Sequence, residues 1–167
     1  MNSAPSAQNA AYFRNFIFGV EDSLVSTVGL LAGIVAAGAA RSQIILTGVV
    51  LICVEGFSMG VGSFLSERSA QEYMAESGGE RMSARAAVIM LFSYCAAGLV
   101  PLFPYILWEP GTAFWLSIIF SIVALLALGL AGGRTTKTSV WKSGLRMALL
   151  GGIAIAIGAA VGTIFKG

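Results

Sequence analysis

The sequence predicts an all-α, polytopic membrane protein that forms one membrane domain over residues 1–167 and crosses the bilayer five times. Hydrophobic residues make up 57% of the chain, and the mean hydropathy is +0.86. Charged residues make up 11%, against about 25% in soluble proteins. Five stretches approach or exceed the roughly 20 apolar residues that a helix needs to cross the bilayer. Lipid must therefore be the solvent for most of the chain.

The five spans occupy most of the sequence. Residues 1–15 form a polar segment, and residues 10–18 predict a short amphipathic helix on the membrane surface. The spans are predicted at about 16–40, 44–64, 86–107, 112–131 and 145–165. The short connections at 41–43 and 108–111 predict that the helices on either side of each pack as antiparallel hairpins, and 65–85 is expected to be a cytoplasmic loop.

Small residues and prolines inside the spans predict how the helices pack. Glycines four residues apart let helix backbones approach closely where no hydrophobic drive acts between helices. Pro101 and Pro104 predict a kink or an unwound turn near the outer end of the third span. The glycines in question are Gly29, Gly33, Gly56, Gly60, Gly151, Gly152, Gly158 and Gly162.

The distribution of Lys and Arg predicts the orientation in the membrane. Only Arg41 and Lys166 lie in the segments on one side. Because basic residues concentrate on the cytoplasmic side, the N-terminus is expected in the cytoplasm and the C-terminus outside. The basic residues do not cluster as nucleic-acid binding requires, so membrane lipid and not nucleic acid is the expected surrounding partner. The eight on the other side are Arg14, Arg68, Arg81, Arg85, Arg134, Lys137, Lys142 and Arg146.

Composition also excludes several kinds of site. The chain has no histidine, which excludes imidazole metal ligands, histidine-ligated haem and a Ser-His-Asp nucleophile. Cys53 and Cys95 lie in apolar stretches and are better interpreted as small buried side chains than as a disulfide. Nothing resembles a catalytic pair, so neither enzyme activity nor a resident cofactor is expected.

Three acidic residues lie inside predicted spans. Glu21 and Asp22 are in the first span, and Glu55 is near the middle of the second. A charge at the bilayer centre costs at least ~2.5–3.5 kcal/mol, and no basic residue is expected inside a span to neutralise it. These acids must face a protein-lined cavity, be protonated or hold a cation, although Glu21 is near enough to the interface to be solvated.

The depth of these residues predicts a metal site. Helix rise places Asp22 about 9 Å and Met59 about 8 Å from the cytoplasmic side, with Glu55 one turn deeper. Carboxylates with a thioether suit Fe²⁺ or Mn²⁺ better than Mg²⁺ or Ca²⁺. The predicted ligands are Asp22, Met59, Glu55 and Glu21, although a methionine in a membrane helix is more often a packing residue.

Four segments resemble the vacuolar iron transporter family. Gly19–Thr27 and Ser58–Ser66 resemble its first two helices, and Pro101–Tyr105 and Ser143–Met147 resemble its third and fifth. The resemblance covers nearly the whole chain in register. It implies a five-helix protein that pairs as a ten-helix homodimer and moves Fe²⁺, often with Mn²⁺, out of the cytosol in exchange for protons.

The resemblance also implies that Asp22 and Met59 line the metal path between two protomers. The chain departs from the family at Gly62-Ser63-Phe64, where many relatives have Gly-Glu-Tyr, so one acid is missing and Glu55 is the expected replacement. Ser23 stands where relatives often have glycine. The 65–85 loop is short, as in the nodulin-like branch, and lacks the large cytoplasmic metal-binding domain.

Acidic residues in this loop have two interpretations. Glu72, Glu76 and Glu80 share one helical stripe at four-residue spacing. They could form a metal-collecting surface at the cytoplasmic mouth. The alternative is an ordinary solvated helix whose acids are balanced by neighbouring arginines.

Together these features predict a proton-coupled exporter of Fe²⁺ and/or Mn²⁺, in which metal and protons compete for the same carboxylates. One alternative is a proton-coupled exporter of small organic cations, although such a pocket needs aromatic walls and Glu55 has only Phe57 nearby. The other is a non-transporting membrane scaffold, which would leave the span acids unexplained. The absence of organelle signals favours the bacterial inner (plasma) membrane.

Overall fold

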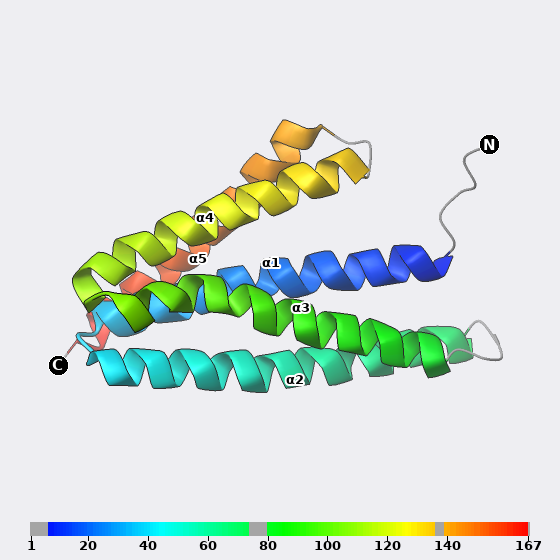
Figure 1. The fold of residues 1–167 in the computed structure, drawn as a ribbon, viewed down its shortest axis with the longest axis horizontal. Helices are drawn as coiled ribbons and strands as arrows, with labels where there is room; N and C mark the ends of the chain where they lie inside the picture. The colour runs from blue at the N-terminus through cyan, green and yellow to red at the C-terminus, as the bar shows by residue number, and fades with distance from the viewer. Residues whose placement is uncertain (1–6, 74–79, 136–138, 167) are drawn as a thin grey trace.

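The computed structural model describes residues 7–73, 80–135 and 139–166, and these fold into five long helices (Figure 1). Each helix is long and apolar enough to cross a membrane. The predicted all-α fold with five spans is therefore confirmed. The helices are α1 (Ala7–Ala36), α2 (Arg41–Tyr73), α3 (Glu80–Leu107), α4 (Pro110–Thr135) and α5 (Val140–Ile164).

Successive helices run in opposite directions, so the connections gather at two ends (Figure 1). The start of α1, the end of α2, the start of α3, the end of α4 and the start of α5 lie at one end, which we call the basic end because the larger group of Lys and Arg residues belongs to it. The α1–α2 turn, the α3–α4 turn and the C-terminus lie at the other end. The uneven distribution of Lys and Arg along the sequence thus places most of these residues at one end of the bundle.

The central helix is α1. It packs along α3 and α5, and it contacts α4 and α2 much less. The helix packed along α2 is α3. The hairpin predicted for the first two spans therefore holds only in part, because a short turn joins the two helices while each of them packs more extensively on α3 than on the other.

Glycines bring α1 and α5 into close contact. A Cβ added at Gly29 would meet the Ala154 carbonyl oxygen at 3.1 Å, and one added at Gly33 would meet the Gly158 carbonyl oxygen at 2.8 Å. Cβ atoms at Gly158 and Gly162 would overlap the carbonyl groups of Gly29 and Gly33 in turn. The predicted close approach through glycines at four-residue spacing is confirmed at this contact.

The helix ends differ from the predicted spans. Residues 37–40, and not 41–43, form the first turn, where Gly38 adopts a left-handed φ of 86°. Helix α1 is continuous from Ala7, so residues 10–18 are its first turns and not a separate surface helix. Helix α2 continues to Tyr73 because its buried face persists beyond the apolar stretch, with Glu67 and Gln71 on it.

Helix α3 stays wound through both of its prolines to Leu107. The unwound turn is therefore not formed. The hydroxyl of Ser117 on α4 donates a hydrogen bond to the Pro101 carbonyl oxygen at 2.7 Å. At the end of α3, the guanidinium of Arg41 donates from Nε to the Tyr105 carbonyl oxygen at 2.8 Å and from Nη2 to the next carbonyl. Arg41 thus supplies partners for carbonyls that a helix end leaves free.

Candidate functional site

A polar stripe runs along α2 at four-residue spacing. Glu55, Met59, Ser63 and Glu67 occupy it; because each four-residue step advances about 40° around the helix, neighbouring members share a face while Glu55 and Glu67 lie about 120° apart. Helix rise gives a length of about 18 Å from Glu55 to Glu67. The stripe runs from a deep group of residues to the basic end of the bundle. The residues around Glu55, at one end of the stripe, differ from those around Glu67, at the other.

At the deep end, three helices contribute polar groups. Asp22 on α1 and Glu55 on α2 are partly buried and interact electrostatically. Tyr94 on α3 is fully buried and interacts electrostatically with both. Its hydroxyl shares a hydrogen bond of 2.8 Å with the Ser26 hydroxyl. We call Asp22, Ser26, Glu55 and Tyr94 the deep cluster.

The deep cluster is positioned by the contact between α1 and α3. The Ser23 hydroxyl donates to the Tyr94 carbonyl oxygen at 2.6 Å. At Gly98, an added Cβ would meet Ser23 Oγ at 2.8 Å and Ile52 Cγ1 at 2.7 Å. Only a residue without a side chain therefore lets the three helices approach at this level. Tyr94 was missed in the sequence because a tyrosine in an apolar stretch carries no sign of what it will contact.

Glu21 lies in a different environment from its neighbour Asp22. Its carboxylate interacts electrostatically with Arg146, in the second turn of α5, as well as with Asp22. Arg146, which lies within the predicted fifth span, therefore partly offsets the charge of Glu21 across the α1–α5 interface.

Met59 lines a cavity of about 710 Å³ on the α1–α2 side of the bundle, which we call the α1–α2 cavity. Asp22 instead lines a separate groove of about 610 Å³ between α1 and α5, whose other lining is almost wholly apolar. The two residues predicted to share a site thus face different hollows. The α1–α2 cavity is lined by Arg14, Asn15, Phe18, Ser58, Met59, Gly62, Ser63, Ser66, Glu67 and Met90.

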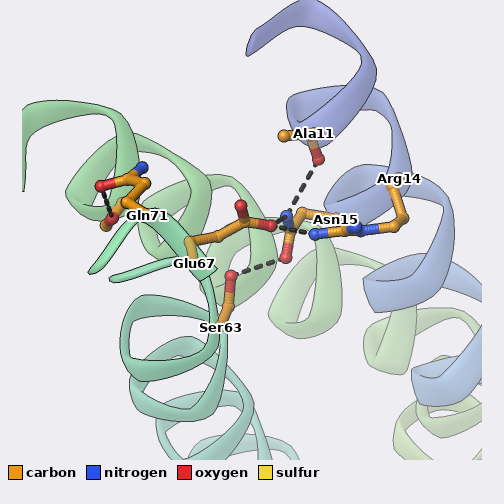
Figure 2. A network of polar contacts seen from close by, with 7 residues as sticks. Ala11, Arg14, Asn15, Ser63, Glu67 and Gln71 are labelled. Carbon is orange, nitrogen blue, oxygen red and sulfur yellow. Dashed lines mark hydrogen bonds and ion pairs between the residues drawn. The ribbon is translucent and has the colours of Figure 1, made fainter. Parts of the chain in front are cut away.

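A polar network occupies the basic end of the α1–α2 cavity (Figure 2). Glu67 is only 7% exposed, and the guanidinium of Arg14 donates to its Oε1. The side-chain amide of Asn15 donates to the same oxygen at 3.3 Å. Asn15 Oδ1 in turn accepts a hydrogen bond of 2.6 Å from the Ser63 hydroxyl. Sequence reasoning placed Glu67 in a loop, although its spacing from Met59 and Ser63 pointed to the same helix face.

The acids expected at the cytoplasmic mouth do not share one helix. Glu72 belongs to α2 and Glu80 begins α3, while Glu76 lies outside the described residues. Arg68 Nε lies 2.9 Å from Glu72 Oε1, and Arg68 Nη1 lies 4.0 Å from Glu80 Oε1. These pairs support the alternative interpretation of a solvated, charge-balanced surface.

Within residues 7–73, 80–135 and 139–166, no three Asp, Glu or Cys side chains gather closely enough to hold a metal ion. The deep cluster brings two carboxylates together, and Met59 lies one turn from Glu55 on the same helix face. A metal bound there would need further oxygen ligands, such as water or groups from a second copy of the chain.

Comparison with known proteins places the chain in a family. The model of the VIT family matches residues 13–84 and 74–163. The two matches overlap at residues 74–84, between the end of α2 and the first residues of α3. The large cytoplasmic metal-binding domain that this chain was predicted to lack would be inserted in this region.

Individual relatives are similar over most of the chain. Vacuolar iron transporter 1 of Eucalyptus grandis is 25% identical over 204 residues, covering 86% of this chain and 82% of the relative. Vacuolar iron transporter homolog 1 of Oryza sativa subsp. japonica is 27% identical over 169 residues, covering 89% and 71%. Vacuolar iron transporter homolog 4 of Arabidopsis thaliana is 28% identical over 163 residues, covering 90% and 82%. Because the family model matches residues in all five helices, this chain belongs to the VIT family.

Proposed function

We propose that this protein exports a divalent transition metal, Fe²⁺ and/or Mn²⁺, from the cytoplasm in exchange for protons. The observation that carries the proposal is the deep cluster, in which the carboxylates of Asp22 and Glu55 interact beside the buried Tyr94. Relatives named as vacuolar iron transporters add support. The proposal makes the protein a transporter and not an enzyme, with the metal as its cargo.

The coupling follows from the competition between metal and protons at Asp22 and Glu55. Two partly buried carboxylates repel each other, so a bound cation or a proton is needed to relieve the repulsion. Metal arriving from the basic end displaces protons from the carboxylate oxygens. Protons arriving from the other end displace the metal. Met59 lies one turn from Glu55 toward the basic end and offers a thioether along the way.

The orientation and assembly are part of the same proposal. The basic end faces the cytoplasm, because Lys and Arg are retained on that side of a membrane. The protein works as a homodimer of ten helices, in which the α1–α5 groove leaves Asp22 open toward a partner. A second copy would bring a second Asp22 and supply the missing ligands.

The proposed location is the inner membrane of a bacterium. The relatives' names refer to the vacuole. Both membranes border the cytoplasm, so the proposed direction of transport, out of the cytoplasm, is the same in either.

The second candidate is a proton-coupled exporter of small organic cations. The observation in its favour is the α1–α5 groove, which combines the Asp22 carboxylate with an almost wholly apolar lining. Phe165 is the one aromatic residue among the described residues that line it. A non-transporting scaffold would leave the deep cluster without a role.

Reconstitution into liposomes tests these alternatives. The protein should take up Fe²⁺ or Mn²⁺ when a pH gradient is imposed, and Asp22→Asn should abolish this uptake without unfolding the protein. Glu109→Gln is the matched control, because Glu109 is 83% exposed at the opposite end from the basic end. Uptake of an organic dye instead of metal would favour the second candidate, and near-normal metal flux in Asp22→Asn would place the site elsewhere.

A further inference from the structure

We propose that Glu67 is a second cation-binding carboxylate, at the basic end of the α1–α2 cavity, and that Arg14 occupies its place until a divalent metal displaces the guanidinium. The identity of the cation rests on the proposed function. The site itself rests on separate observations, because Glu67 lies about 18 Å along α2 from Glu55 in the deep cluster.

The first observation is the unequal burial of the two charged partners. The Glu67 side chain is 8% exposed, whereas the Arg14 side chain is 68% exposed. A buried carboxylate is stable only with a cation beside it. Here the anion is fixed inside the protein and the cation is mostly hydrated. The guanidinium can therefore withdraw into water at little cost, provided that another cation takes its place.

The second observation is that the Glu67 carboxylate opens onto a cavity. Glu67 and Arg14 both line the hollow of about 710 Å³ that also contains Met59. Six waters around a metal ion need about 180 Å³, at roughly 30 Å³ per water. A hydrated divalent ion thus fits beside Glu67 before it loses its water.

The third observation is the chemistry of the lining. Asn15, Ser63 and Ser66 supply oxygens, and Met59 and Met90 supply thioethers. The oxygen ligands suit Mn²⁺, and the thioethers favour transition-metal ions such as Fe²⁺ over Mg²⁺ and Ca²⁺. Asn15 is already held in place by Ser63 and Glu67. The site is therefore built before the cation arrives.

This arrangement predicts opposite effects for its two charged residues. Mn²⁺ binding is measured by titration calorimetry on the purified full-length chain carrying Asp22→Asn, so that binding at Glu67 is read apart from the deep cluster. Adding Arg14→Gln removes the competing cation and should tighten Mn²⁺ binding about tenfold, while adding Glu67→Gln should weaken it about tenfold or more, as for loss of a charged partner. A pair that only joins α1 to α2 would lower the melting temperature in both variants and leave the affinity unchanged.

Controls separate this pair from general surface charge. Arg68→Gln removes a positive charge next to Glu67 in sequence, but Arg68 is paired with Glu72 and Glu80, so the affinity should change less than twofold. Glu67→Asp keeps the charge and should retain more Mn²⁺ binding than Glu67→Gln. If Glu67→Gln does not fold, Arg14→Gln and Glu67→Asp still decide the question.

Three results would overturn the proposal. One is an unchanged affinity in Arg14→Gln, another is an equal gain in Arg68→Gln, and the third is no Mn²⁺ binding in the Asp22→Asn background with or without Arg14→Gln. The calorimetry does not depend on transport. Loss of metal flux with intact binding at Glu67 would therefore count against the proposed function and not against this site.

Discussion

Gly158 on α5 lies so close to Gly29 on α1 that a methyl group at position 158 would overlap the Gly29 carbonyl. We expect Gly158→Ala to destabilise the fold by about 1–3 kcal/mol, because neither backbone can move away without disturbing a helix. Thermal unfolding in detergent measures this. Gly152→Ala on the same helix is the control, since nothing among the described residues lies within 4 Å of the added Cβ. Equal melting temperatures for the two variants would show that α1 and α5 do not meet at this point.

The Tyr94 hydroxyl is expected to matter for both stability and transport. Tyr94→Phe removes the hydrogen bond of 2.8 Å to Ser26 and should cost about 1 kcal/mol of unfolding free energy. The same change removes a polar group from beside Asp22 and Glu55, so the KM for Mn²⁺ should rise. Tyr73→Phe is the control, because Tyr73 is 93% exposed.

A double-variant cycle tests whether Tyr94 acts through Ser26. If the two hydroxyls stabilise the fold through one shared hydrogen bond, Ser26→Ala combined with Tyr94→Phe should unfold at about the same temperature as either single variant. Strictly additive losses would show that the two side chains stabilise the protein independently.

Arg41 should be required to hold the C-terminal end of α3. Arg41→Gln removes donors to two carbonyls at the end of that helix and the charge that lies 3.7 Å from Glu109. We expect a loss of about 1–3 kcal/mol in unfolding free energy. Arg41→Lys should not restore it, because an ammonium group lacks the fork of donors that reaches both carbonyls. Full recovery by lysine would show that charge alone is needed.

The proposed orientation is tested with reporters in bacterial cells. A fluorescent protein inserted in the 74–79 connection should fold and fluoresce in the cytoplasm, while one fused after Gly167 should stay dark. Alkaline phosphatase at the same two positions should give the reverse pattern. The opposite result at both positions would mean that the basic end faces outward, against the distribution of charge.

The sequence was sufficient to predict the five helices, because each needs only a long apolar stretch. It was less informative about the ends of α2. The apolar stretch stops near Phe64, but the buried face continues through Glu67 and Gln71 to Tyr73. Hydropathy alone does not distinguish a buried polar side chain from a solvated one. The partner that buries Glu67 is Arg14, more than fifty residues earlier in the chain.

The predicted site was built from acids and a methionine whose depths could be estimated. Depth along a helix says nothing about rotation around its axis, so Asp22 and Met59 were placed together although they line different hollows. Ser63, which stands where relatives have an acid, has acidic side chains on both sides along α2. Glu67, one turn toward the basic end, lines the cavity of Met59, whereas Glu55 interacts with Asp22.

The position of α2 at the edge of the bundle affects how the protein can move. Helix α2 packs mainly on α3 and touches α1 much less, and a row of large apolar side chains along it is exposed. A displacement of α2 disturbs mainly its extensive packing on α3, whereas a displacement of α1 disturbs packing against α3, α4 and α5. Helix α2 therefore depends on one neighbour for most of its packing, and the ion pair between Arg14 and Glu67 joins it directly to α1.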